Sequence, residues 1–295
     1  AFNDTLTGDG NNNVLIGGSG NDTLNGGAGD DTLDGGAGTD TASYATAIAG
    51  VTVDLSLATA QNTGGAGIDT LIGIENVTGS AFDDILIGNS GDNILLGGNG
   101  NDVFIGGAGD DTLNGASGTD TADYSHATSG VTVALNLTTA QTIGGGEGID
   151  TLSGIENITG SAFDDVLIGN SGVNILIGGD GNDILNGDAA SDTLDGGAGI
   201  DTADYSTAYG NIGVTINLVT QSVGGGGSGD VLISIENVTG SGLNDTLTGD
   251  ANDNILKGAG GNDTLNGGAG NDILDGGDGT DTVSYCDATS GVAVD

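Results

Sequence analysis

The sequence predicts an all-β solenoid, and three observations support this prediction. Gly makes up 63 of the 295 residues, with no Gly-X-Y period and no Pro, Met or Trp. Such a composition is typical of either a disordered linker or a repeat solenoid. The hydrophobic residues, 35% of the chain, are spaced regularly, which favours the solenoid. A nine-residue unit also recurs in register through four blocks of the chain.

The nine-residue unit is clearest at 17–34, where two copies read GGSGNDTLN and GGAGDDTLD. Six residues, G-G-x-G-x-D, suit a turn, because glycine adopts positive φ and fits where a Cβ has no room. The other three, x-Leu-x, suit a short strand whose Leu points inward, as Leu24 and Leu33 would. Asp22 and Asp31 close the two turns with a carboxylate. Two strands and two turns make one coil of 18 residues, and coils stack at about 4.8 Å.

The nine-residue units belong to a second, longer repeat. The phrase that begins DTASYA at 40–45 returns three times, at spacings of 80, 81 and 80 residues. Because no linker separates the copies, we expect one continuous solenoid. Both ends of the chain fall inside the repeat, so we expect it to be a piece of a longer array. The predicted modules are 1–80, 81–161 and 162–241, with a partial fourth at 242–295.

Each module begins with a run of five turn-and-strand units. The second unit of every run closes with Asn instead of Asp, at Asn13, Asn93, Asn174 and Asn254. A Tyr follows the last turn of each run on the inward face of the strand, at Tyr44, Tyr124, Tyr205 and Tyr285. We expect these Tyr side chains to continue the core.

The second part of each module departs from the nonapeptide. GVTVDLSL at 50–57 alternates, which predicts a longer strand with Val51, Val53, Leu55 and Leu57 on one buried face. The segments at 130–137 and 213–218 predict the same. A glycine-rich loop follows, then one more turn, closed by Asp69, Asp150 or Asp230. The next segment, GIENVT at 73–78, predicts a shorter coil with Ile74 and Val77 inward.

The unit resembles the nonapeptide of the repeats-in-toxin (RTX) calcium-binding family, G-G-x-G-x-D-x-U-x. The resemblance covers the four runs closely and the segments between them loosely. It implies a right-handed parallel β-roll or β-helix stabilised by stacked Ca²⁺ ions, with longer strands interrupting the nonapeptide runs. It also implies that the turn aspartates are Ca²⁺ ligands: Asp4, Asp22, Asp31, Asp40, Asp69, Asp84, Asp102, Asp111, Asp120, Asp150, Asp165, Asp183, Asp192, Asp201, Asp230, Asp245, Asp263, Asp272 and Asp281.

The spacing also makes chemical sense for calcium. Ca²⁺ takes six to eight oxygens from carboxylates and carbonyls, and flexible, carbonyl-rich turns suit it better than Mg²⁺. Asp often only satisfies turn amides, but carboxylates stacked along an edge repel one another unless cations lie between them. We expect about three or four sites per run, on the order of 12–16 in all. The Asn turns should hold Ca²⁺ more weakly or lack it, because Asn offers one neutral oxygen.

Composition and charge exclude several functions. With 42 acidic residues against Lys257 alone, the net charge is −41, so nucleic acid and anionic membranes are not expected partners. The sequence contains no apolar run of 18 residues, so membrane insertion is not predicted. His126 is the only His and is expected at the surface, where it cannot form a zinc site alone. Cys286 has no Lys, Arg or His neighbour in sequence to activate it and is interpreted as a chance small residue.

Two further motifs recur once per module and are interpreted as structural. The glutamates of the GIENVT-type coils, Glu75, Glu156 and Glu236, are about 80 residues apart, too far to act as the paired carboxyls of a glycosidase. The sequons that begin at Asn76, Asn157 and Asn237 follow the module repeat and are interpreted as strand-edge chemistry.

These observations predict a non-catalytic, calcium-binding structural segment. The resemblance implies a secreted bacterial protein, extracellular or at the cell surface, that passes a type I secretion channel unfolded and folds on meeting Ca²⁺. It would serve as a stiff rod, a filament or surface-layer module, or an adhesin stalk. Neighbouring copies or cell-surface polysaccharide are candidate partners. A further hypothesis is an adhesin whose ligand, which the sequence does not identify, binds the loops near Gln61, Gln141 and Gln221. A second hypothesis is a calcium-binding appendage of a secreted lipase, metalloprotease or alginate epimerase.

Overall fold

The computed structural model describes residues 2–207, 211–227, 229–286 and 288. These residues form thirty-four β-strands and no helix, so the all-β prediction is confirmed. Accordingly, none of them belongs to a helix long and apolar enough to cross a membrane. The chain divides into two compact units: unit 1 holds residues 1–127 and 137–157, and unit 2 holds residues 128–136 and 158–295. Residues 289–295 of the predicted fourth module lie outside the described part.

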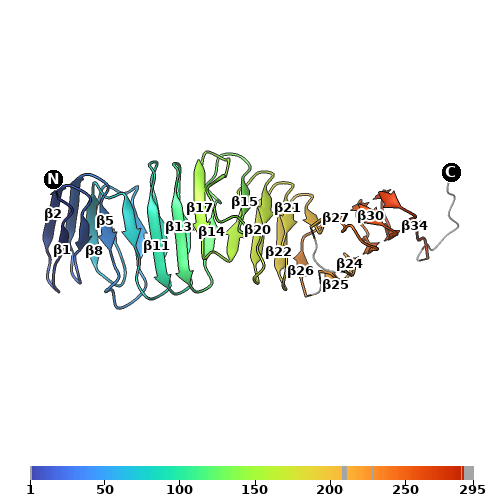
Figure 1. Cartoon of the computed structure of the whole chain (residues 1–295), viewed down its shortest axis with the longest axis horizontal. Helices are drawn as coiled ribbons and strands as arrows, with labels where there is room; N and C mark the ends of the chain where they lie inside the picture. The colour runs from blue at the N-terminus through green and yellow to red at the C-terminus, as the bar shows by residue number, and fades with distance from the viewer. Residues whose placement is uncertain (1, 208–210, 228, 287, 289–295) are drawn as a thin grey trace. The chain divides into compact units, whose positions relative to one another are not determined.

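Short strands of unit 1 stack in parallel in the order of the sequence (Figure 1). They are β1 (Thr5–Thr7), β2 (Val14–Ser19), β3 (Thr23–Asn25), β4 (Thr32–Ala37), β5 (Thr41–Ser43), β6 (Thr52–Asp54), β7 (Gln61–Asn62), β8 (Ile68–Ile72), β9 (Asn76–Thr78), β10 (Ile85–Ile87), β11 (Ile94–Asn99), β12 (Val103–Ile105), β13 (Thr112–Ser117), β14 (Thr121–Asp123), β16 (Gln141–Thr142) and β17 (Ile149–Ser153).

Unit 2 repeats this arrangement. Its strands are β15 (Thr132–Ala134), all but the first residue of β18 (Asn157–Thr159), β19 (Val166–Ile168), β20 (Ile175–Asp180), β21 (Ile184–Asn186), β22 (Thr193–Ala198), β23 (Thr202–Asp204), β24 (Val214–Asn217), β25 (Ser222–Gly225), β26 (Val231–Ile233), β27 (Asn237–Thr239), β28 (Thr246–Thr248), β29 (Ile255–Lys257), β30 (Gly260–Gly261), β31 (Thr264–Asn266), β32 (Ile273–Asp275), β33 (Asp278–Gly279) and β34 (Thr282–Val283).

The strand register confirms the 18-residue coil. In unit 1, Leu6 pairs with Leu24 and Leu15 with Leu33. An eight-stranded sheet runs β1-β3-β5-β9-β11-β13-β17-β16, and a four-stranded sheet runs β2-β4-β8-β7. In unit 2, β15-β19-β21-β23-β27-β29-β32 form a seven-stranded sheet with the same register. Like residues therefore lie above like residues along each sheet.

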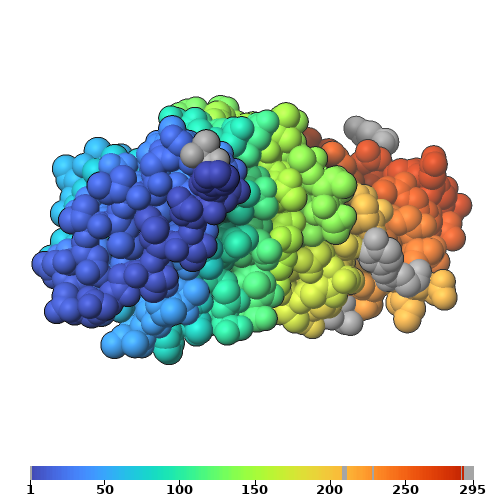
Figure 2. Space-filling view, turned by 60° about the vertical axis from the view of Figure 1, so that its left-hand side comes forward, coloured from blue at the N-terminus to red at the C-terminus, as the bar shows by residue number. Residues whose placement is uncertain are grey.

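The core is the predicted ladder of inward side chains. Leu33, Leu95 and Leu113 are fully buried, as is Phe104. Because successive strand residues point to opposite faces, their neighbours on the same strands face outward. In the space-filling view, the colours of unit 1 pass from blue to green as coil follows coil (Figure 2). The buried stripe is only one residue wide on each three-residue strand. The turns therefore carry much of the remaining stabilisation.

The irregular coils rejoin the ladder in register. Leu71 of β8 pairs above Leu33, and Val77 of β9 pairs above Ala42. Ile74 and Val77 are buried as predicted. The glycine-rich loop that precedes β8 folds back as an antiparallel pair, in which Gln61 lies opposite Asp69. Equivalent antiparallel pairs are β16–β17 in unit 1 and β25–β26 in unit 2.

The predicted strand at 50–57 is wrong in its length. Only β6 is strand; Val51 and Val53 are buried, but Leu57 is 42% exposed. The chain turns because Asp54 Oδ1 accepts the backbone N–H of Ser56 at 2.8 Å, which ends the strand. The expectation for the four Tyr also needs a correction, because Tyr285 is 48% exposed whereas the other three are buried.

Candidate calcium sites

The third, fourth and fifth turns of each run share a left-handed second residue. In the first run these residues are Gly18, Gly27 and Gly36, with φ of 101°, 94° and 98°. Ala116, Asp188 and Ala259 adopt the same conformation in later runs, with φ of 67°, 69° and 72°. In the first turns of the later runs, by contrast, a Ser at this position donates its N–H to the closing Asp.

One oxygen of each closing Asp reaches back to the preceding coil. The backbone N–H of Asp22 donates to Asp40 Oδ1 at 2.7 Å, and that of Asp4 donates to Asp22 Oδ1 at 2.8 Å. The same bond joins Asp84 to Asp102 at 2.9 Å. Within a run, the carboxylates therefore form a ladder that fixes each turn against the next turn on the same edge.

The second oxygen has no donor. Among the described residues, nine turn carboxylates have a buried Oδ2 without a hydrogen-bond partner: Asp22, Asp31, Asp40, Asp102, Asp111, Asp120, Asp183, Asp201 and Asp263. Each of these residues is at most 2% exposed. A buried, ionised oxygen without a partner is strongly unfavourable, and a bound cation would stabilise these atoms.

A glycine leaves the space that such a cation would need. Asp22 Oδ2 and the carbonyl oxygen of Gly35 both face the point where a side chain at Gly17 would place its Cβ. Gly178 is faced in the same way by Asp183 Oδ2 and the Gly196 carbonyl. Carboxylate and carbonyl oxygens that converge on a space free of side chain match the donor set of Ca²⁺.

Burial also changes the acidity of these carboxyl groups. Burial, together with a smaller contribution from neighbouring carboxylates, raises the pKa of Asp102, Asp111 and Asp183 to about 7. For Asp102 these neighbours are Asp84 and Asp120. The desolvated charges therefore repel one another along the ladder, and a cation between them would relieve both effects.

The first turn of the later runs is closed by protein donors instead. Asp84 Oδ2 accepts the backbone N–H of Ser80 at 2.6 Å, and Asp84 Oδ1 accepts the Ser80 hydroxyl and the Val51 N–H, each at 2.7 Å. The equivalent turns pair Ser161 with Asp165 and Ser241 with Asp245. Both oxygens of these three Asp are satisfied without a cation. The sequence signal is the Ser that replaces the second glycine of the unit.

The Asn turns are closed in the same way. Asn93 Oδ1 accepts the N–H of Asn89 at 2.8 Å, and Asn93 Nδ2 donates to the Glu75 carbonyl at 2.7 Å. Asn254 makes the same pair of bonds, with Asp250 and Glu236. The coil that precedes each of these turns presents a carbonyl rather than an N–H at this point. Asn is suited to it because Asp has no N–H to donate.

The extra turn of each irregular segment also uses protein donors. Asp69 Oδ2 accepts the Thr63 hydroxyl at 3.0 Å, whereas Asp150 Oδ2 accepts the Tyr124 hydroxyl at 3.1 Å. In unit 2, Asp230 Oδ2 accepts the Tyr205 hydroxyl at 2.9 Å. The residues at the position of Thr63 are Ile143 and Val223, which cannot donate. The Tyr hydroxyl takes over where the Thr is missing, a role that sequence reasoning did not assign to it.

The residue before each closing Asp forms a second, exposed ladder. Asn3 Oδ1 accepts the N–H of Asn21 at 2.9 Å, and Asn21 Oδ1 accepts the N–H of Thr39 at 3.2 Å. Asp83 and Asn101 continue this pattern in the next run, at 2.7 and 2.9 Å. Sequence reasoning missed this ladder. The available signal was the frequent Asn or Asp at that position, which gives way to Thr or Ile in the last turn of each run.

The other predicted ligands lie in less enclosed places. Asp4 is exposed, and Asp272 and Asp281 are half-buried. Asp192 is buried, with Oδ1 accepting the Asn174 N–H at 2.8 Å, and burial raises its pKa to about 7. In the described part of the chain, no three Asp, Glu, His or Cys side chains converge as a metal cluster. A site here must therefore combine carboxylates with backbone carbonyls.

The predicted surface position of His126 is confirmed. His126 and Cys286 are exposed. Asn76 of the first sequon is 8% exposed, and its Oδ1 accepts the N–H of Ile94 at 2.8 Å. That amide is thus part of the strand pairing.

Parallel β-coils whose glycine turns carry buried, partnerless carboxylates define a calcium-binding repeat protein. A family model of the RTX calcium-binding nonapeptide repeat (4 copies) matches more than half of the chain, at residues 1–23, 7–42, 72–104, 87–122, 150–183, 168–203, 239–274 and 248–283. The chain belongs to this family, and its fold is the parallel β-roll of RTX repeats. A search of curated proteins found no match.

Proposed function

We propose that this chain is an extracellular structural segment that folds on taking up Ca²⁺ after secretion. The observation that carries the proposal is the set of nine buried Oδ2 atoms without a donor. The excess of 42 acidic residues over one basic residue supports it, because the compact state lacks cationic side chains to offset its charge.

The coupling follows from where the donor atoms come together. Carboxylates of one coil and carbonyls of the next meet only when the coils are stacked, so the unfolded chain lacks the site. A ligand that binds only the folded form adds its binding free energy to the stability of the fold. Extracellular calcium modules commonly bind at about 10⁻⁴–10⁻³ M, which suits folding outside the cell and an unfolded chain within it.

The nineteen predicted aspartate ligands then divide by their surroundings. We assign direct coordination to the nine with a partnerless Oδ2, together with the carbonyls that face them. Six others have both oxygens engaged by protein donors and would hold their turns without an ion: Asp69, Asp84, Asp150, Asp165, Asp230 and Asp245.

The role proposed for the segment is mechanical rather than catalytic. Its buried carboxylates are committed to turns, and it contains one His, one Cys and one Lys. A filament, surface-layer or adhesin-stalk module fits this composition, with further copies of the chain or cell-surface polysaccharide as partners. Polysaccharide recognition through Gln61 itself is not favoured, because its amide bonds both the N–H and the carbonyl of Asp54 within the loop.

Circular dichroism tests the proposal directly. The chain in EDTA should give the spectrum of a disordered polypeptide and gain β signal when Ca²⁺ is raised to the millimolar range. Mg²⁺ at the same concentration is the control and should give less β signal, since Mg²⁺ demands a more regular set of ligands. A β spectrum that is already complete in EDTA would contradict the proposal.

A further inference from the structure

A glutamate takes the place of the missing Asp where each run of turns meets an irregular coil. Within a run, the N–H of one closing Asp donates to the carboxylate of the Asp one coil further on. At the end of the first run, the N–H of Asp40 donates instead to Glu75 Oε2 at 2.8 Å. The same bond joins Asp120 to Glu156 and Asp201 to Glu236, both at 2.9 Å.

The last Asp of each of these runs still has its partnerless oxygen. Asp40 is fully buried and its Oδ2 has no donor. This oxygen and the carbonyl of Gly73 both face the space beside Gly35 that a Cβ would fill. In the regular part of the run, the Gly35 carbonyl serves the space beside Gly17 in the same way. The equivalent groups in the next two runs are Gly115, Asp120 and the Gly154 carbonyl, and Gly196, Asp201 and the Ser234 carbonyl.

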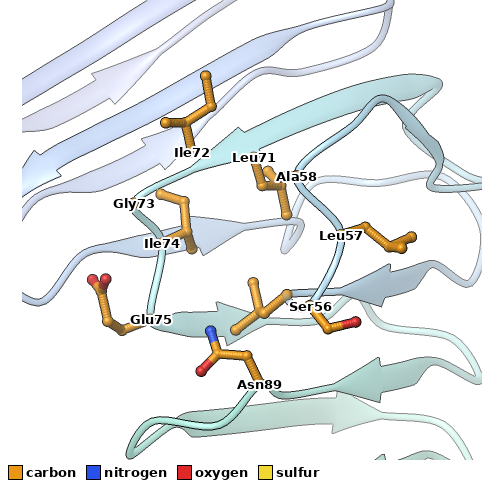
Figure 3. A pocket seen from close by; sticks show the side chains of 10 residues that line it. Ser56, Leu57, Ala58, Leu71, Ile72, Gly73, Ile74, Glu75 and Asn89 are labelled. Carbon is orange, nitrogen blue, oxygen red and sulfur yellow. The ribbon is translucent and has the colours of Figure 1, made fainter.

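The backbone of the irregular coil is held in the conformation that aims this carbonyl. Gly73 and Gly154 have φ of 55° and 59°, and Ser234 keeps a φ of 51° although it carries a side chain. Glu75 follows two residues later. Its carboxylate lies on the opposite side of the 73–75 segment from Leu57 and Leu71, away from the apolar side chains of the neighbouring pocket (Figure 3). The coil thus supplies both a carbonyl and a carboxylate, as a regular turn does.

We propose that Glu75, Glu156 and Glu236 each complete a Ca²⁺ site at the end of a run, with the partnerless Asp oxygen and the facing carbonyl. The proposal rests on the calcium-dependent function proposed above. A neutral oxygen would be enough to accept the Asp40 N–H. The chain instead places a glutamate carboxylate next to the buried last Asp in all three runs. Two such charges repel unless a cation lies between them.

The test compares Glu→Gln substitutions in the full chain. Gln keeps an oxygen for the Asp40 N–H but removes the charge, so Glu75→Gln, Glu156→Gln and Glu236→Gln together should preserve the cap and lose three ions. Ca²⁺ stoichiometry and affinity are measured by competition with a chromophoric chelator. Asp54→Asn, which removes one carboxylate charge at a strand end outside the glycine turns, is the matched control for Glu75→Gln alone. We expect three fewer tight sites, or three sites weakened by about 10- to 100-fold, and no change in the control.

Other outcomes separate this inference from the function on which it rests. Wild-type stoichiometry and affinity in the triple Gln variant would overturn the site and leave the glutamates as caps only. If the triple variant fails to gain β signal at saturating Ca²⁺, Glu75→Gln alone is judged by the loss of one site. Glu75→Ala alone, which removes cap and charge, should melt at a lower temperature than Glu75→Gln. A wild-type chain that binds no Ca²⁺ would refute the proposed function itself.

Discussion

Asp102 and Asn93 close neighbouring turns of one run, yet their side chains meet different partners. Asp102 gives one oxygen to the Asp84 N–H and leaves the other without a donor. Asn93 has a donor for its oxygen and an acceptor for its amide nitrogen. The sequence predicts that the two turns differ in calcium binding, but not that Asn93 is a structural residue. That role depends on the carbonyl of Glu75, which lies 18 residues away.

Replacing each of these two residues by Ala should separate calcium binding from stability. Asp102→Ala should weaken Ca²⁺ binding by about 10- to 100-fold at its site, because the charged ligand is lost. Asn93→Ala should leave Ca²⁺ affinity nearly unchanged but lower the free energy of unfolding by about 1–3 kcal/mol, since buried polar groups lose their partners. Calcium titration and melting at fixed Ca²⁺ measure the two effects. An equal or greater loss of Ca²⁺ affinity in Asn93→Ala would contradict the assignment.

A second residue-scale prediction concerns Ala116, which has a φ of 67° where most turns carry glycine. A non-glycine residue in this conformation is strained by about 1–2 kcal/mol, whereas glycine loses more chain entropy on folding. Ala116→Gly should therefore raise the free energy of unfolding by up to about 1 kcal/mol, measured by melting at fixed Ca²⁺. The reverse change at the preceding turn of the same run, Gly107→Ala, should destabilise, because its Cβ would meet the Asn89 carbonyl. A lower melting temperature for Ala116→Gly would refute the prediction.

At the scale of the element, the turns divide into those that need an ion and those that do not. The spacing of Leu24, Leu33 and Asp22 is enough to predict the coil, because a fixed register places like residues above like residues. The self-closed turns were not predicted, although the Ser80 substitution of glycine was visible. The strand ended early at Asp54 because an Asp–Ser hydrogen bond competed with the apolar alternation. Local side-chain hydrogen bonds thus determine which turns close without an ion and where the strand ends, and the sequence period alone does not predict either.

The extra turns differ in the residue that donates to the closing Asp: Thr63 donates to Asp69, and Tyr124 donates to Asp150. This difference can be tested. Tyr124→Phe should leave Asp150 Oδ2 buried without a donor and lower the free energy of unfolding by about 1–3 kcal/mol. Tyr44→Phe is the matched control, because Thr63 donates to the equivalent Asp69 Oδ2 and remains as a donor when the Tyr44 hydroxyl is removed. Melting of the two variants at fixed Ca²⁺ measures the difference. Equal melting temperatures would show that the Tyr hydroxyl does not hold the turn.

At the scale of the whole chain, the formal charge of −41 governs the calcium-free state. Burial raises the pKa of several turn carboxyls, including Asp111 and Asp183, from an ordinary 3.8 to about 7. The folded form therefore binds protons that the unfolded chain releases between about pH 4 and 7. The stability contributed by these protons is present at low pH and is lost as the pH rises through 7.

Without calcium, the chain should accordingly gain β structure as the pH falls from 8 to 5. Circular dichroism of protein dialysed free of Ca²⁺ measures this gain. The affinity for Ca²⁺ should show the opposite pH dependence and fall as the pH falls, because protons compete with the ion for the same oxygens. A calcium-free chain that is equally or less structured at pH 5 than at pH 8 would contradict the expectation.

The strands before and after each irregular segment pair with their inward residues in register, even though the segments differ in length. Gln61 lies opposite Asp69, whereas Gln141 lies opposite Asp150, one residue further on, and the ladder above both loops is unchanged. Doubling the length of a flexible loop costs only about 0.6 kcal/mol in closure entropy. These loops are therefore the places where the chain can accept a foreign peptide, and a displayed epitope inserted there would leave the stacked turns in phase.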